Sequence, residues 1–97
     1  MKMNYLELRK SDFMNFNYTI TNELGIHARP AGILVQEIKN FESKVTISLN
    51  GKSIDASSIM NIMMLQVKQG DTIIIEATGP DEANAIEYLK KFMEENF

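Results

Sequence analysis

Apolar and polar residues alternate in three short stretches of the chain, and a period of two predicts half-buried strands. The alternating apolar residues are Phe16, Tyr18 and Ile20, then Val45, Ile47 and Leu49, and finally Ile73 and Ile75. Asn50-Gly51 directly follows the second set and predicts a type I′ hairpin turn, because both residues tolerate a positive φ. Residues 52–56 are therefore expected to form the returning strand, with Ile54 facing the interior.

Three further stretches repeat apolar residues at helical spacing. The first helix is expected to start at residues 27–28, with Pro30 in its first turn, where a missing N–H does little harm. The second is expected over residues 58–65, and the last begins at residues 80–81 with Glu82 in its first turn. The apolar residues expected to be buried are Ala31, Leu34, Val35, Ile38 and Phe41; Ile62 and Leu65; and Ile86, Leu89 and Met93.

The predicted order of elements is βαββαβα. This order is typical of an α+β open-faced sandwich, in which a four-stranded antiparallel sheet carries three helices on one face. The 97 residues suffice for one domain with its own core. Residues 1–13 precede the pattern and are expected to be a disordered or loosely packed extension, which leaves residues 14–97 as the folded domain.

Composition and charge exclude several functional classes. Ten Lys and Arg against thirteen Asp and Glu give a net charge of −3 without a basic run, so no electrostatic footprint for nucleic acid is present. The absence of Cys excludes disulfides and thiol chemistry, and a single His is too few for a His-based metal site. No apolar stretch approaches the roughly 18 residues that a membrane-spanning helix needs. We expect a cytoplasmic monomer that needs no metal or cofactor.

The only histidine, His27, lies at the predicted start of the first helix, two residues before Arg29. One interpretation is a structural histidine that caps the helix or lies on the surface. The other is a nucleophile, because the unpaired N–H groups of a helix start favour an anion and a guanidinium suits oxyanions. A phosphoryl group on the ring would lie between these groups. No second His, Cys or carboxylate pair accompanies the motif, so a carrier that relies on a partner fits better than an autonomous enzyme.

The stretch SSIMNIMML, residues 57–65, is rich in Met. Projected at about 100° per residue, Ile62 and Leu65 share one side of the predicted helix, and a second apolar set lies on another side. The second set consists of Ile59, Met60 and Met63. A short helix on an open sheet has one face to bury, so this set predicts an exposed surface for partners. The alternative is a buried helix in which Met fills gaps.

Ser57 or Ser58 is the predicted N-cap of this helix. A phosphate on Ser58 is compatible with the helix dipole and would add a charge of about −1.5 to −2 beside the apolar surface. Such a modification would weaken partner binding without unfolding the protein, as a regulatory switch requires.

Two of these motifs resemble the signatures of one family. GIHARPA closely resembles the active-site histidine signature of the HPr family, the phosphocarriers of the bacterial phosphoenolpyruvate:sugar phosphotransferase system, and SSIMNIMMLQVKQG resembles the signature around that family's regulatory serine. The resemblance covers about residues 14–96. It implies that His27 accepts a phosphoryl group on Nδ1 from phosphorylated enzyme I and passes it to a IIA component of a sugar transporter. It also implies that Arg29 stabilises the phosphohistidine and that Ala28 contributes a backbone N–H.

The resemblance further implies a regulated docking surface. The residues that match docking positions for enzyme I and IIA domains are Ile59, Met60 and Met63. Ser58 matches the serine that an ATP-dependent kinase modifies in Gram-positive bacteria, giving a form that binds a catabolite-control repressor. The alternative function is an HPr-like regulatory binding module that acts mainly through its serine-phosphorylated form on a transcription factor or enzyme.

Two positions depart from the family pattern. Asn61 and Gln66 stand where Gly is common in Gram-positive members, so local differences are expected in the second helix and at its exit. Ser57 beside Ser58 leaves open which hydroxyl a kinase would modify.

Overall fold

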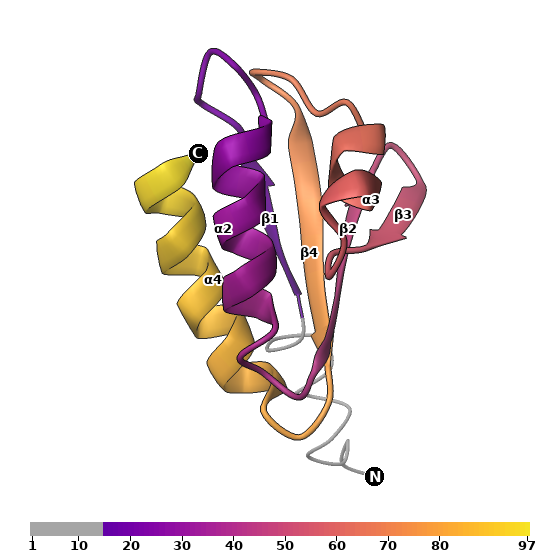
Figure 1. Ribbon diagram of the computed structural model, residues 1–97, viewed down its shortest axis with the longest axis vertical. Coiled ribbons are helices and arrows are strands. Elements are labelled where there is room, and N and C mark those ends of the chain that lie inside the picture. Colours follow the sequence, from indigo (N-terminus) through magenta and orange to yellow (C-terminus); the bar gives the residue numbers. More distant parts are fainter. Residues whose placement is uncertain (1–14) are drawn as a thin grey trace, which may run out of the picture.

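The computed structural model describes residues 15–97, and the expected extension of residues 1–13 lies outside the described part. The elements are β1 (Asn15–Thr19), α2 (Ala28–Ile38), β2 (Lys44–Leu49), β3 (Lys52–Asp55), α3 (Ile59–Met64), β4 (Thr72–Thr78) and α4 (Glu82–Asn96). The strands form one antiparallel sheet in the order β1-β4-β2-β3. Figure 1 shows α2 and α4 packed side by side against this sheet, with α3 near β2 and β3. The predicted α+β open-faced sandwich is therefore confirmed.

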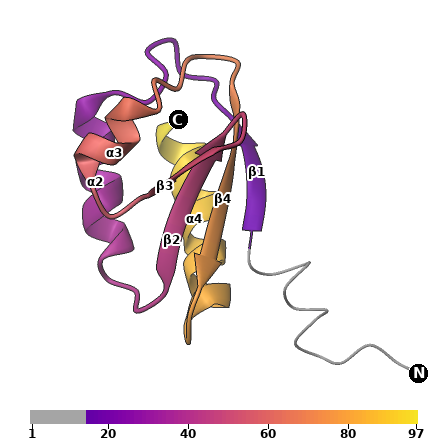
Figure 2. The same ribbon diagram turned by 90° about the vertical axis from the view of Figure 1, so that its right-hand side faces the viewer.

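The central strand β4 shows how the alternating pattern builds the core. Ile73, Ile75 and Ala77 are buried beneath the helices, whereas the residues between them face outward. The partner of Ile75 on β1 is Phe16 and its partner on β2 is Ile47, so three strands supply one apolar layer. Each fully buried side chain of this size stabilises the fold by about 1.5–3 kcal/mol. Figure 2 shows the sheet from another side, with the helices packed along it.

The β2–β3 hairpin has the predicted two-residue turn. Leu49 pairs with Lys52, which leaves Asn50 and Gly51 as the turn residues, with φ values of 51° and 86°. Both positive values are those that a type I′ turn requires. Ile54 of the returning strand is half-buried against the core, as predicted.

Helix boundaries differ from the prediction in all three helices. α3 spans Ile59–Met64 rather than 58–65, because Ser58 and Leu65 are its N-cap and C-cap. α2 ends at Ile38, so Phe41 lies beyond the helix, where its ring packs against Tyr88 of α4 with centroids 5.8 Å apart. α4 begins at Glu82 rather than at residues 80–81, because Asp81 is the N-cap and turns its carboxylate away from its own helix. Within residues 15–97, no helix combines the length and the apolar content that crossing a bilayer requires.

The carboxylate of Asp81 joins two loops at the end of the molecule opposite His27. It accepts the backbone N–H groups of Glu42 and Ser43, each at 2.9 Å, and the Ser43 hydroxyl at 2.5 Å. Gly79 completes this junction, since a Cβ at its φ of 154° would lie 2.6 Å from the Ser43 Cα. The Ser43 hydroxyl, and after it the Glu42 N–H, hold the pKa of Asp81 below its ordinary value of 3.8.

Replacing this carboxylate should destabilise the fold in a pH-dependent way. The folded-state pKa is lowered, so the contribution is present at neutral pH and is lost as the pH falls through that pKa. We expect Asp81→Ala to lower Tm by on the order of 5 °C at about pH 7 and by less at about pH 3, which lies below the ordinary carboxyl pKa. Thermal unfolding followed by circular dichroism at both pH values checks this, and an equal Tm difference at both would contradict it.

Candidate functional site

His27 occupies the N-cap position of α2, with φ −110° and ψ 169°. The first turn contains Ala28, Arg29 and Pro30, and its first regular bond runs from the Ala31 N–H to the His27 carbonyl at 3.1 Å. Proline has no N–H, so two first-turn N–H groups, those of Ala28 and Arg29, remain without an intrahelical acceptor. Within residues 15–97, the start of α2 therefore presents two unpaired N–H donors directly after the histidine.

The imidazole of His27 is left without the partners that a structural histidine would have. Within residues 15–97, the ring forms no capping hydrogen bond and its buried Nδ1 has no hydrogen-bond partner. An unpaired buried polar atom costs about 1–3 kcal/mol, so a native structure rarely retains one without a reason. The interpretation of His27 as a capping histidine is therefore wrong, whereas a nitrogen kept free for a ligand fits the geometry.

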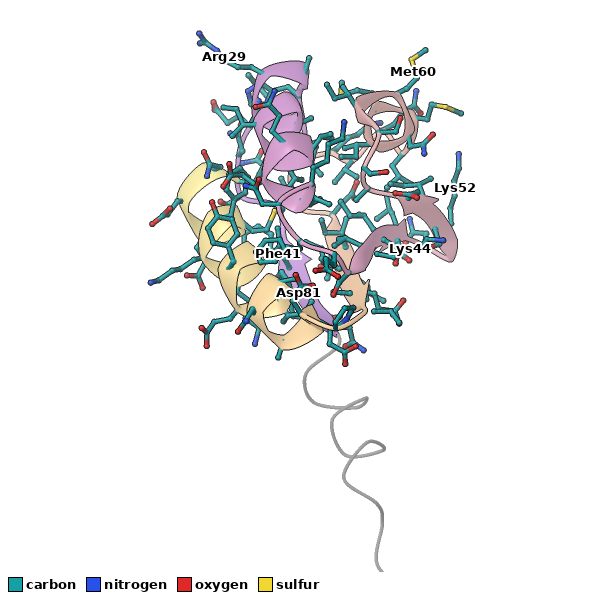
Figure 3. The ribbon with its side chains drawn as sticks, turned by 60° about the horizontal axis from the view of Figure 1, so that its bottom comes forward. Arg29, Phe41, Lys44, Lys52, Met60 and Asp81 are labelled. Atoms are coloured by element: carbon teal, nitrogen blue, oxygen red, sulfur yellow. The ribbon has the colours of Figure 1, made fainter. Side chains whose placement is uncertain are left out.

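A shallow hollow of about 320 Å³ lies along α2 beside these groups. The residues lining it are Arg29, Gly32, Ile33, Val35, Gln36, Lys39 and Ile59. α2 and α3 are close neighbours here, since a Cβ on Gly32 would lie in ordinary van der Waals contact with Cδ1 of Ile59, at 3.6 Å. In Figure 3, Arg29 points away from α2 into solvent, and Met60 does the same from α3. The site thus presents an exposed cation and an apolar surface on neighbouring helices.

Four exposed side chains of α3 form an apolar surface, which we call the apolar patch. They are Ile59 (43% exposed), Met60 (74%), Met63 (37%) and Met64 (61%). Ile62 is buried on the opposite side of the helix. The predicted exposure of the first three residues is confirmed. Met64 had not been singled out, although a six-residue helix with one buried side chain leaves it nowhere else to face.

Leu24 is a further exposed apolar residue that the sequence pattern did not reveal. It is 71% exposed and lies three residues before His27, in the turn that leads to α2. Its N–H donates to Oδ1 of Asn22 at 2.8 Å, which fixes the turn. A single Leu in a turn belongs to no apolar period, so its exposure could be learned only from the structure.

The structure distinguishes the two neighbouring serines. Ser58 is the N-cap of α3, and its Oγ accepts the Asn61 N–H at 3.2 Å. The Ser57 hydroxyl instead donates to Oδ1 of Asp55 at 2.7 Å, and the Ser57 N–H reaches the same oxygen at 2.9 Å. These two bonds hold the pKa of Asp55 below its ordinary value of 3.8, and the bond from the Ser57 hydroxyl has the larger effect. The Ser57 hydroxyl thus donates to a carboxylate, whereas the Ser58 hydroxyl oxygen accepts a backbone N–H.

Asn61 and Gln66, for which local differences were expected, have different structural consequences. Nδ2 of Asn61 donates to the Asp55 carbonyl at 3.2 Å and so ties α3 to the end of β3. Gln66 has a φ of 54°, a left-handed conformation that glycine adopts more readily. The residue that follows α3 and its C-cap therefore has a backbone conformation that suits glycine better than glutamine, and this costs some backbone strain.

The fold and the site together define a protein class: an open-faced sandwich with a histidine at the start of its first described helix, whose Nδ1 has no hydrogen-bond partner within residues 15–97, beside a helix with exposed apolar side chains. Residues 14–95 match the family profile described as PTS HPr component phosphorylation site. The chain belongs to the HPr family of phosphocarrier proteins, as its motifs had indicated.

Individual relatives agree with this assignment. The phosphocarrier protein HPr of Cupriavidus necator is 44% identical over 79 residues, which cover 81% of this chain and 89% of that protein. The solved histidine-containing phosphocarrier protein of Mycoplasma is 41% identical with a TM-score of 0.80, covering 84% of this chain and 92% of that one. The Bacillus subtilis catabolite repression containing protein Crh, solved as a dimer with a swapping domain, is 37% identical with a TM-score of 0.69, covering 80% and 90% of the two chains.

Proposed function

We propose that this chain carries phosphoryl groups on His27, receiving them from phosphorylated enzyme I and delivering them to IIA components of sugar transporters. The observation that carries the proposal is the free Nδ1 of His27 at a helix start with two unpaired N–H groups. Membership of the HPr family supports the same role. The reducing cytoplasm is the expected compartment, and a monomer the expected state.

The transfer itself needs few groups from this chain. The Nδ1 lone pair of neutral His27 attacks the phosphorus, and the bond from phosphorus to the donor breaks with its electron pair leaving on the donor. The N–H groups of Ala28 and Arg29 and the Arg29 guanidinium are the donors available to the phosphoryl oxygens. The reverse attack by an acceptor on a IIA domain discharges the carrier. Partner proteins supply the remaining catalysis.

The burial of Nδ1 adds a step to this mechanism. Nδ1 is shielded from solvent in the described structure, so the ring has to turn before that nitrogen can meet a donor. Within residues 15–97, Nδ1 has no hydrogen bond to break during the turn. Rotamer changes of such partly exposed side chains are fast, so turning the ring need not limit the transfer.

The apolar patch is the proposed contact surface for both partners. Ile59, Met60 and Met63 of the patch lie on the helix that borders the hollow containing Arg29. Met adapts its shape to different surfaces, which suits a carrier that must bind one protein to be charged and another to be discharged.

Ser58 is the proposed regulatory site, modified by a serine kinase or phosphorylase. Its contacts favour it over Ser57, whose hydroxyl is held by Asp55 and would carry a phosphate directly against that carboxylate. A phosphate on Ser58 would place about −1.5 to −2 charges next to Ile59 at the edge of the apolar patch. We expect this form to bind enzyme I poorly and to suit a catabolite-control repressor instead.

Incubation of the chain with enzyme I and phosphoenolpyruvate tests the proposed function. Wild-type protein should acquire acid-labile phosphate, and His27→Ala should acquire none, because the N–P bond of a phosphohistidine forms only on the imidazole. Label that survives His27→Ala would contradict the proposal. Acid-stable phosphate alone, formed with a serine kinase and ATP, would favour the regulatory binding module.

Arg29 should matter for transfer, and Lys39 provides a matched control because it is a second cation in the same hollow. A hydrogen bond to a charged group is worth about 1.5–3 kcal/mol, so Arg29→Ala should slow transfer by roughly 10- to 100-fold. Lys39→Ala should transfer at close to the wild-type rate. Rapid-quench kinetics with phosphorylated enzyme I measure both, and equal losses would show that charge in general, rather than Arg29, is required.

Ser58→Asp should mimic the modified form. The added charge next to the apolar patch should raise KM for enzyme I by about tenfold, while the circular dichroism spectrum and Tm stay close to those of the wild type. Ser58→Ala, which adds no charge, should keep the wild-type KM. An unchanged KM in Ser58→Asp would remove the support for Ser58 as the switch.

A further inference from the structure

The position of His27 depends on its backbone rather than on its side chain. Within the described part of the chain, the imidazole neither caps α2 nor forms a hydrogen bond through Nδ1. A reacting atom must lie within tenths of an ångström of its productive position, and a misplacement of about 1 Å can cost roughly 100-fold in rate. Whatever fixes the segment before His27 therefore also fixes the nucleophile.

That segment, residues 20–26, is bound closely to the loop after α3. The Ile26 N–H donates to the Val67 carbonyl at 3.2 Å. Gly25, with a φ of 66°, lies so close to this carbonyl that a Cβ would be 2.2 Å from its oxygen. The Asn22 carbonyl accepts the Gly25 N–H at 3.0 Å and closes the intervening turn. These contacts hold the half of the segment nearest to His27.

Thr21 holds the other half, where three parts of the chain meet. Its N–H and its hydroxyl both donate to the Phe97 carbonyl at 2.9 Å, and the Asn22 N–H joins them at 3.0 Å. The Thr21 carbonyl accepts Nε2 of Gln69 at 3.1 Å, from the same loop that carries Val67. Thr21 thus binds the end of α4 on one side and the loop after α3 on the other.

The acceptor that Thr21 uses is itself firmly placed. Phe97 is buried, its ring packs against Phe92 with centroids 6.4 Å apart, and its N–H bonds to the Met93 carbonyl at 2.8 Å. Figure 1 shows the end of α4 near the loop that leads into α2. The anchor of this segment therefore comes from a helix distant in sequence, which buried aromatic packing keeps in place.

We propose that Thr21 is a positioning residue for phosphoryl transfer at His27, acting through its hydrogen bonds to Phe97 and Gln69. The inference rests on the proposed phosphocarrier function and adds a residue six positions before the nucleophile. Thr21 does not belong to the apolar patch, so loosening it should slow the transfer step and leave partner docking unchanged.

Thr21→Val and Thr19→Val form a matched pair for the test. Each variant replaces a threonine by the isosteric valine and so removes one hydrogen bond of a hydroxyl group. The Thr19 hydroxyl bonds to the Thr72 hydroxyl at 2.8 Å, on the exposed side of the sheet. One hydrogen bond of about 1 kcal/mol corresponds to roughly fivefold in rate. With phosphorylated enzyme I, Thr21→Val should lose about fivefold in kcat at unchanged KM, and Thr19→Val should lose nothing.

Two further variants identify the hydrogen bonds as the cause. Thr21→Ser keeps the hydroxyl and should restore the wild-type kcat, whereas Gln69→Ala removes the bond to the Thr21 carbonyl and should lower kcat in the same direction. Wild-type kcat in Thr21→Val, an equal loss in Thr19→Val, or a change in KM alone would overturn the proposal.

Amide hydrogen exchange separates this proposal from the proposed function, because it needs no phosphoryl donor. Thr21→Val should speed exchange of the Ile26 N–H by about fivefold, and Thr19→Val should leave it unchanged. If the wild type accepts no phosphoryl group from enzyme I, the proposed function fails while the exchange still reports on Thr21. If exchange at Ile26 is the same in both variants, the positioning role fails whatever the labelling shows.

Discussion

Nδ1 of His27 is buried and has no hydrogen-bond partner within residues 15–97. The backbone carbonyl of the same residue accepts the first hydrogen bond of α2. An atom in this state opposes folding by about 1–3 kcal/mol, so other contacts have to keep it where it is. Pro30 has no N–H, so the N–H groups of Ala28 and Arg29 are the donors that the first turn of α2 offers. The described site is an imidazole followed by a small set of N–H donors, which is the arrangement that the proposed carrier needs.

The stability that permits this arrangement comes from regions away from the site. Ile73 and Ile75 of β4 are buried among three strands and two helices, and the Asp81 carboxylate closes the loops at the far end. The side of the molecule that carries His27 contributes less to stability. It contains the exposed residues of the apolar patch and the left-handed Gln66. Exposed apolar surface and backbone strain are typical of surfaces kept for binding rather than for folding.

Much of the fold could be predicted because each element carries a local signal. The alternation of Ile73 with Ile75 and the pair Asn50-Gly51 need only their neighbours to be interpreted, and both predictions are confirmed. The boundary near Asp81 was wrong because Asp81 has the non-helical backbone of an N-cap, with φ −114° and ψ 28°, and its carboxylate binds Ser43 in a distant loop, so no local pattern indicates where α4 starts. The contact between Thr21 and Phe97 joins residues 76 positions apart, and no local pattern predicts it. For the site, the sequence indicated His27, Arg29 and the exposed face of α3, but it could not indicate that Nδ1 is buried or which serine is held by Asp55.

The central claim is that Nδ1 of His27 receives the phosphoryl group. NMR of the ¹⁵N-labelled full chain, charged with enzyme I and phosphoenolpyruvate, measures this directly, because coupling to phosphorus identifies the nitrogen that carries the group. The account predicts coupling at Nδ1 together with shifts of the Ala28 and Arg29 amide protons. Phosphorus bound to Nε2, or a phosphorylated chain with no nitrogen–phosphorus coupling at His27, would contradict it.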